Sequence, residues 1–173
     1  MSGGSQDREE ADRLLAALAR YRTARQEFLA AMGLPGSNRD PLAELAEMLV
    51  AALMGGTLAT SRVQADYDVV LAGGATVQVR YLANSGATWV NEHRVYRIRR
   101  NVLYALVIFE AFVVVGVLVF PSDELGSICA ALGKRHPHQD SQLLLTRINW
   151  WAIRDAPDRF RALGMRVWLS PLT

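Results

Sequence analysis

The chain has 173 residues, which is enough for one domain with a hydrophobic core. Hydrophobic residues make up 51% of it and charged residues 21%, a composition that excludes an intrinsically disordered protein. The net charge of +2 is mildly basic, which is compatible with a nucleic-acid partner but does not require one.

Two further features bear on the cellular compartment. The chain has a single cysteine, Cys129, so neither an internal disulfide nor a cysteine metal cluster can form. Its first ten residues lack the apolar segment of a secretory signal. We therefore expect a protein of the reducing cytoplasm.

Apolar residues recur at three- and four-residue steps across residues 7–32, which predicts a helix capped by Asp7. The segment 33–37, rich in glycine and proline, ends it. Packing of this helix on its own domain is the favoured interpretation, and a homodimer contact or a partner-binding helix stays open. We expect residues 1–38 to form an N-terminal helical arm.

A second helix is predicted over residues 41–54, with Asp40 as its N-cap and Pro41 as its first residue. Glu44 and Glu47 lie three positions apart and therefore share a side of this helix. Residues 57–66 form a polar connector in which Arg62 and Gln64 are candidates for a phosphate contact.

A β-hairpin is predicted over residues 67–82, because two runs of strand-forming residues flank Gly73-Gly74. Gln78 and Arg80 are two apart and share one face of the second strand, and the hairpin can fold Asp68 against them. An acid, an amide and a cation would then converge. Carboxylate and amide oxygens suit Mg²⁺, and a cation beside the metal can stabilise a transition-state phosphate. An exposed edge hairpin with a solvated polar face is the alternative.

The most basic stretch is residues 91–101, where arginines surround a histidine and a tyrosine. Such side chains hold phosphate backbones, and an exposed strand without a ligand is the alternative. A second basic segment, 133–140, is predicted to be a loop that faces DNA or only solvent. The candidate DNA-binding residues are His93, Arg94, Arg97, Arg99, Arg100, Lys134, Arg135 and His136.

Residues 103–120 form an apolar run of 18 residues with one charge, Glu110. Its valines and aromatic residues favour two buried strands with a turn at Glu110-Ala111. A transmembrane helix is the alternative, but a glutamate at its centre would be costly. We therefore expect no membrane association.

The C-terminal third is predicted to contain a helix from Ser122 or Asp123 to about residue 132, which includes Cys129 as a core residue. A short strand follows at 142–145, then a segment in which Trp150 and Trp151 belong to the core. A helix beginning near Asp155 and a strand at 165–169 complete the chain.

The hairpin motif resembles the core of the PD-(D/E)XK nuclease superfamily, which includes many restriction endonucleases. Asp68 matches the family's aspartate, and after nine residues Gln78-Val79-Arg80 stands where (Glu/Gln)-x-Lys is expected. The order of elements over residues 41–150 agrees with that core. The resemblance implies an α/β fold with a restriction-endonuclease-like mixed central sheet flanked by helices, formed by residues 39–173, with the apolar strands as its third and fourth.

The resemblance also implies a function, a metal-dependent DNA endonuclease of restriction or defence type that uses Mg²⁺ or Mn²⁺. Asp68 and Gln78 would be metal ligands together with the carbonyl of Val79, and Glu47 would act from the helix, with Glu44 as the fallback. Arg80 would stabilise the transition state, but arginine departs from the family's lysine and is a poor base. A catalytically degenerate subunit that binds DNA or assembles into a complex is therefore the alternative.

Overall fold

The computed structural model describes residues 3–61, 66–84, 89, 92–99 and 101–171. The chain divides into two compact units, residues 1–45 and 46–173. Arg62, Gln64 and Arg100, three of the candidate phosphate-binding residues, lie outside the described residues.

The first unit contains helix α1 (Gly3–Ala31) and the beginning of helix α2 (Pro41–Met54). Helix α1 begins four residues before Asp7, so the prediction that Asp7 caps it is wrong. Gly33, with φ of +76°, ends it as predicted. Leu14, Leu18 and Tyr21 in its middle turns are each 59% exposed, and packing of this helix on its own domain stays a prediction.

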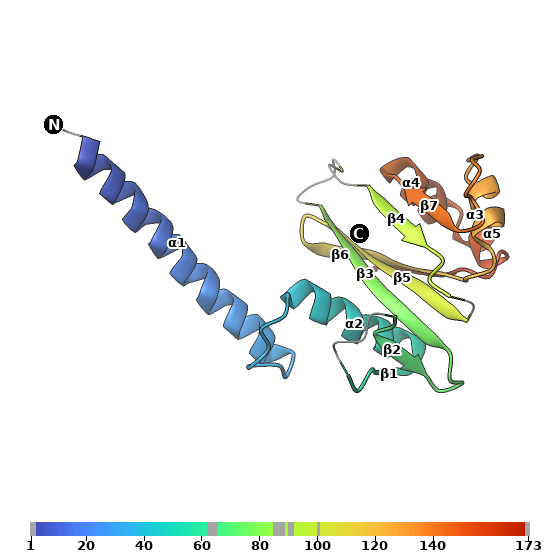
Figure 1. Cartoon of the computed structure of the whole chain (residues 1–173), viewed down its shortest axis with the longest axis horizontal. Helices are drawn as coiled ribbons and strands as arrows, with labels where there is room; N and C mark the ends of the chain where they lie inside the picture. Colours follow the sequence, from blue (N-terminus) through green and yellow to red (C-terminus); the bar gives the residue numbers. More distant parts are fainter. Residues whose placement is uncertain (1–2, 62–65, 85–88, 90–91, 100, 172–173) are drawn as a thin grey trace. The chain divides into compact units, whose positions relative to one another are not determined.

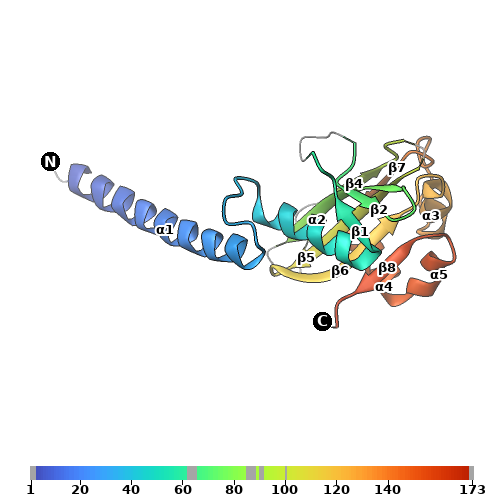
Figure 2. The same cartoon turned by 90° about the horizontal axis from the view of Figure 1, so that it is seen from below.

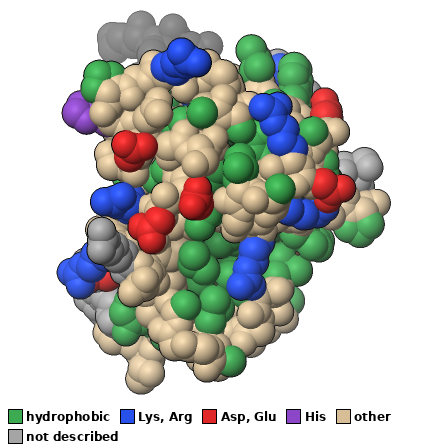
Figure 3. Space-filling view, turned by 90° about the vertical axis from the view of Figure 1, so that its right-hand side faces the viewer, with side chains coloured by type: hydrophobic (Ala, Val, Ile, Leu, Met, Phe, Trp, Pro, Cys, Tyr) green, Lys and Arg blue, Asp and Glu red, His purple; other side chains and the backbone are tan. Residues whose placement is uncertain are grey.

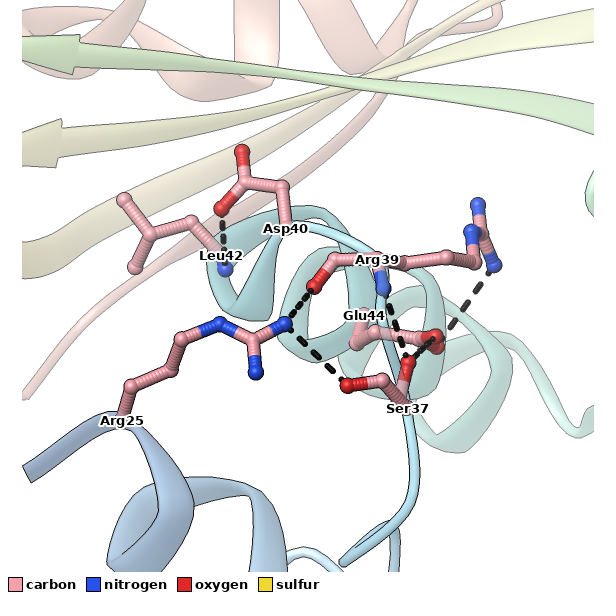
Figure 4. Close-up of polar contacts among 6 residues, drawn as sticks. All are labelled: Arg25, Ser37, Arg39, Asp40, Leu42 and Glu44. Atoms are coloured by element: carbon pink, nitrogen blue, oxygen red, sulfur yellow. Dashed lines mark hydrogen bonds and ion pairs between the residues drawn. The ribbon is translucent and has the colours of Figure 1, made fainter. Parts of the chain in front are cut away.

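The start of α2 is held by side-chain hydrogen bonds (Figure 4). Asp40 is its N-cap as predicted, because Asp40 Oδ1 accepts the amide of Leu42 at 3.0 Å. Glu44 accepts the hydroxyl of Ser37 at 2.9 Å and lies 3.5 Å from the guanidinium of Arg39. Arg25 on α1 donates to the carbonyls of Ser37 and Arg39, which ties the loop between the helices to α1.

The second unit is built on a mixed six-stranded sheet in the order β1-β2-β3-β5-β6-β8 (Figure 1). Strands β3 and β5 are parallel, and the other neighbours are antiparallel. The expectation of an α/β protein with a mixed central sheet is confirmed. The strands are β1 (Gly56–Leu58), β2 (Val69–Leu71), β3 (Thr76–Asn84), β5 (Val102–Glu110), β6 (Val113–Phe120) and β8 (Arg166–Leu169).

One face of this sheet is covered by a two-stranded sheet, β4 (His93–Tyr96) with β7 (Gln142–Leu145), and by three helices. Figures 1 and 2 show β4 and β7 beside the central sheet. The helices are α3 (Leu125–Ala131), α4 (Arg147–Asp155) and α5 (Pro157–Arg161). The main core joins Leu106 and Ile108 of β5 to Val95, Leu143 and Trp150. Burial of these apolar side chains is the main force that holds the layers together.

The opposite face of the sheet is apolar as well. Val77 and Val79 of β3 alternate with Gln78 and Arg80, and both valines are buried. The part of α2 from Ala46 onward lies along the sheet in both views (Figures 1 and 2). A helix on one side and the smaller sheet on the other explain why β5 is buried on both faces and reads as one apolar run.

Several local predictions are confirmed. The hairpin forms with its turn at Gly73-Gly74, where Gly74 has φ of +81° and donates to the carbonyl of Leu71 at 2.8 Å. The apolar run splits into β5 and β6 around Ala111 and Phe112, both with positive φ. No helix in the described part of the chain is long and apolar enough to cross a membrane.

Other local predictions are wrong. The predicted polar connector overlaps β1, which pairs with β2 although its sequence carries no strand signal. Helix α3 takes Glu124 as its N-cap position, without a side-chain cap, in place of Ser122 or Asp123. The segment around the two tryptophans, which the sequence assigns to neither helix nor strand, is helix α4, capped by Thr146. Trp150 is buried as expected, whereas Trp151 is half-buried under the guanidinium of Arg147.

Candidate functional site

The site begins at Asp68, which lies just before β2. Asp68 extends the pairing of β2 with β3 on one side and with the segment after β1 on the other. The amide of Asp68 donates to the carbonyl of Val77 at 2.9 Å, and the carbonyl of Asp68 accepts the amide of Ala59 at 2.8 Å. Strand β2 pairs with β3 only as far as Val77. The side chain of Asp68 therefore lies where the edge of β3 is no longer covered by β2.

The carboxylate of Asp68 uses one oxygen for three contacts with β3. Asp68 Oδ2 accepts the backbone amide of Val79 at 2.7 Å and the side-chain amide of Gln78 at 2.5 Å. It also lies 3.6 Å from NH1 of Arg80. The predicted convergence of Asp68, Gln78 and Arg80 is present, and the carboxylate replaces the missing strand as the partner of Val79.

Gln78 and Arg80 differ in their exposure although they share a face of β3. Gln78 is 2% exposed, and its Oε1 atom is buried without a hydrogen-bond partner. The side chain of Arg80 is 50% exposed, and its NH1 atom donates to the carbonyl of Val79 at 2.7 Å. The Asp68 carboxylate therefore contacts a buried amide donor and a solvent-accessible cation.

A pocket of about 330 Å³ opens beside these two residues. It is lined by Gln78, Arg80, His93, Arg94, Tyr96, Ile98 and Tyr104. The register of β3 with β5 places Gln78 opposite Tyr104, and β4 contributes the residues of the basic stretch. The pocket thus joins the hairpin motif to the basic segment, which are separate features in the sequence.

His93 and Tyr104 form a neutral pair within this pocket. His93 Nε2 lies 2.7 Å from the hydroxyl of Tyr104. Burial, and after it the charge of Arg80, lowers the pKa of His93 below its ordinary value. Burial raises the pKa of Tyr104 to about 12. Both rings are therefore uncharged at neutral pH, so the fixed positive charge of the pocket comes from arginine.

Of the predicted DNA-binding residues in the first basic stretch, the described arginines are exposed, whereas His93 is half-buried. Arg94, Arg97 and Arg99 are all exposed, and Arg99 forms an ion pair with Asp66 at 2.6 Å. Tyr96 is 48% exposed and lines the pocket together with Arg94. On the face seen in Figure 3, basic and acidic side chains are interspersed, so no large surface of one charge forms there.

The second basic stretch is connected to the first through β7. Lys134 donates to the carbonyl of Leu144 at 2.5 Å, and Leu144 pairs with Arg94 of β4. Arg135 is exposed and His136 is half-buried in the same loop. The two basic segments, about forty residues apart in the sequence, therefore meet at the small sheet.

The two acidic residues of α2 have different surroundings. Glu44, at 2% exposure, contacts Ser37 and Arg39 in the first unit, which assigns it a structural role at the helix start. Glu47 belongs to the second unit and is 5% exposed. A glutamate that is this buried is unusual and requires polar partners.

A metal ion has a limited set of ligands in this region. Within the described ranges, no three His, Cys, Asp or Glu side chains gather closely enough to hold one. The other oxygens near Asp68 are Gln78 Oε1, on the side-chain amide whose Nε2 donates to Asp68, and the carbonyl of Val79, which accepts from Arg80. The unpartnered Oε1 is a buried acceptor that a cation or its bound water would satisfy, so these residues fit a Mg²⁺ site with one carboxylate and several waters.

Tyr104 and Ile98 are site residues that sequence reasoning missed. Tyr104 lies within the apolar run, whose sequence predicts only buried strands. Its hydroxyl in an otherwise apolar strand was a signal, but the pairing of β3 with β5 was needed to place it opposite Gln78.

No protein-family model matches this chain, and no curated protein is significantly similar to it. Its class therefore rests on the structure, an α/β protein with a mixed six-stranded sheet and a polar site at the edge of β3.

Proposed function

We propose that the protein is a restriction-endonuclease-like DNA endonuclease that requires Mg²⁺ or Mn²⁺. The observation that carries the proposal is the meeting of Asp68, Gln78 and Arg80 beside a pocket lined by residues of basic strand β4. Phosphodiester hydrolysis needs an anionic ligand set for a metal and a cation for the phosphate. At this edge of the sheet, the carboxylate of Asp68 would supply the first and the guanidinium of Arg80 the second.

Each residue has a proposed role. Asp68, Gln78 and the carbonyl of Val79 would hold the metal. Glu47 lies on α2, which covers the other face of the sheet from Gln78 and Arg80. The metal, when bound, supplies a water of lowered pKa and neutralises charge on the phosphate. Arg80 binds a phosphate oxygen and stabilises the charge that develops on it, since an arginine cannot act as the base. The basic residues of β4 and of loop 133–140 hold the DNA backbone.

A second candidate is a nuclease-like subunit that binds DNA without cutting it. It is favoured by one observation, namely that NH1 of Arg80 donates to the carbonyl that a metal would use. In such a subunit residues 7–32 would be the segment that contacts a second copy or another protein, through the exposed Leu14, Leu18 and Tyr21.

The two candidates are separated by incubating supercoiled plasmid with the purified protein and Mg²⁺ or Mn²⁺, with EDTA as the metal-free control. The test variant is Asp68→Asn, because it removes the charge but keeps an acceptor for the amide of Val79. Its matched control is Asp158→Asn, whose carboxylate is 90% exposed on α5. Metal-dependent nicking that Asp68→Asn abolishes and Asp158→Asn retains would support the endonuclease. DNA binding without nicking would favour the second candidate.

A further inference from the structure

We propose that Arg80 occupies the metal position in the DNA-free protein and leaves it for a phosphate of the DNA backbone, so that DNA and metal bind cooperatively. This inference rests on the proposed function, because it concerns the same metal ligands. It adds a role for Arg80 before the chemical step, as a cation that competes with the metal until DNA is present.

The first argument is the position of the guanidinium. NH1 of Arg80 lies 2.7 Å from the carbonyl oxygen of Val79 and 3.6 Å from Asp68 Oδ2. These two oxygens belong to the proposed metal ligands. A guanidinium that donates to the first oxygen and lies near the second carries the same sign of charge as a metal ion. Arg80 and the metal therefore exclude each other from this position.

The second argument is that Arg80 can leave. Its side chain is half-exposed and lies on the wall of the pocket that also contains Arg94 and Tyr96. A phosphate in that pocket would offer the guanidinium two oxygens in a planar, bidentate geometry, which a single carbonyl cannot match. Binding of DNA would thus draw Arg80 away from Val79.

The consequence follows from thermodynamic linkage. If DNA binds the conformation in which Arg80 has left Val79, and metal binds that conformation too, then each ligand raises the affinity for the other by the same factor. Coupling between two such sites commonly amounts to 5- to 150-fold in affinity. We expect each ligand to raise the affinity for the other about tenfold. The reason is that a single contact, that of Arg80 with the carbonyl of Val79, is exchanged for a contact with a phosphate.

The test measures Mn²⁺ binding by the electron paramagnetic resonance signal of free Mn²⁺, with and without excess short DNA duplexes of random sequence. Mn²⁺ bound by the duplexes alone is measured and subtracted. The test variant is Arg80→Gln, which removes the competing charge. Its matched control is Arg154→Gln, since Arg154 has a similar side-chain exposure of 44% and lies on α4.

Without DNA, we expect Arg80→Gln to bind Mn²⁺ about tenfold more tightly than the wild-type protein, and Arg154→Gln to match the wild type. With DNA, the wild type and Arg154→Gln should gain about tenfold, while Arg80→Gln should change by less than twofold. This pattern would support the inference independently of any cleavage.

Two outcomes would overturn the inference and distinguish it from the proposed function. Equal Mn²⁺ affinity of the wild type and Arg80→Gln, together with metal-dependent plasmid nicking, would show that Arg80 does not compete while the endonuclease proposal stands. Absence of specific Mn²⁺ binding in every variant, with circular dichroism spectra of folded protein, would refute both.

Discussion

Removal of the Asp68 carboxylate should destabilise the protein because two buried donors lose their acceptor. Asp68→Ala leaves the backbone amide of Val79 and the side-chain amide of Gln78 without the oxygen that they share. Each unsatisfied buried donor costs roughly 1–3 kcal/mol. Asp68 is 14% exposed at its side chain, so water can partly replace it, and the lower part of the range applies to each donor. We therefore expect a loss of about 2–3 kcal/mol in the free energy of unfolding.

The assay is urea unfolding followed by tryptophan fluorescence. All four tryptophans lie in the second unit, so the signal reports the unit that contains the site. The midpoint should fall with an unchanged slope. Asp68→Asn, which keeps one acceptor, should lose about half as much. Asp158→Ala is the control and should stay within about 0.5 kcal/mol of wild type, since its ion pair with Arg161 is exposed.

The reasoning would be refuted if Asp68→Ala unfolded at the same urea concentration as the control. That result would mean that the carboxylate does not satisfy Val79 and Gln78, and that the polar site is open to water. A destabilised Asp68→Ala would also mean that the loss of nicking in this variant is not by itself proof of a catalytic role. For this reason the nicking assay depends on Asp68→Asn.

Three further predictions concern other parts of the second unit. Burial lowers the pKa of His93, so on acidification the imidazole is protonated in the unfolded chain before it is protonated in the folded protein. The free energy of unfolding should therefore fall as the pH drops below about 6.5. The decrease in urea midpoint from pH 7 to pH 5 should be smaller for His93→Gln than for the wild type. Gly116→Ala would place a methyl group 2.5 Å from the ring of Trp150 and should lower the free energy of unfolding by about 1–3 kcal/mol. Thermal unfolding would measure this loss, and a melting temperature equal to that of the wild type would contradict the close packing. Thr146→Ala removes the capping box with Asn149 and should cost about 1 kcal/mol by urea titration, and Thr146→Ser should restore most of it.

Helices and hairpins with strong local signals were predictable. Gly73-Gly74 predicted a tight turn because glycine accepts the positive φ that the turn requires. Asp40 before Pro41 predicted the start of α2 because a carboxylate can accept the free amides of the first turn. Strand β1 and helix α4 were missed because their residues have weak propensities, and contacts with distant segments decide their conformation.

The core of the site was predictable for the same local reason. Asp68, Gln78 and Arg80 belong to one hairpin, and the alternation of side chains along a strand places the last two on one face. The choice between Glu44 and Glu47 was open in the sequence, since both share a side of α2. The structure engages Glu44 with Ser37 and Arg39, contacts that depend on the path of the preceding loop.

The pocket was decided by tertiary structure alone. Tyr104 lies opposite Gln78 because β5 pairs in parallel with β3. His93 contacts Tyr104 because β4, paired with β7 in the smaller sheet, packs on the central sheet. The pairing of strands that are far apart in the sequence depends on the burial of both faces of β5, and not on the residues that form the pocket. The amino-acid pattern therefore predicted the acid, the amide and the cation, whereas the position of the basic strand beside them depended on how the apolar layers pack.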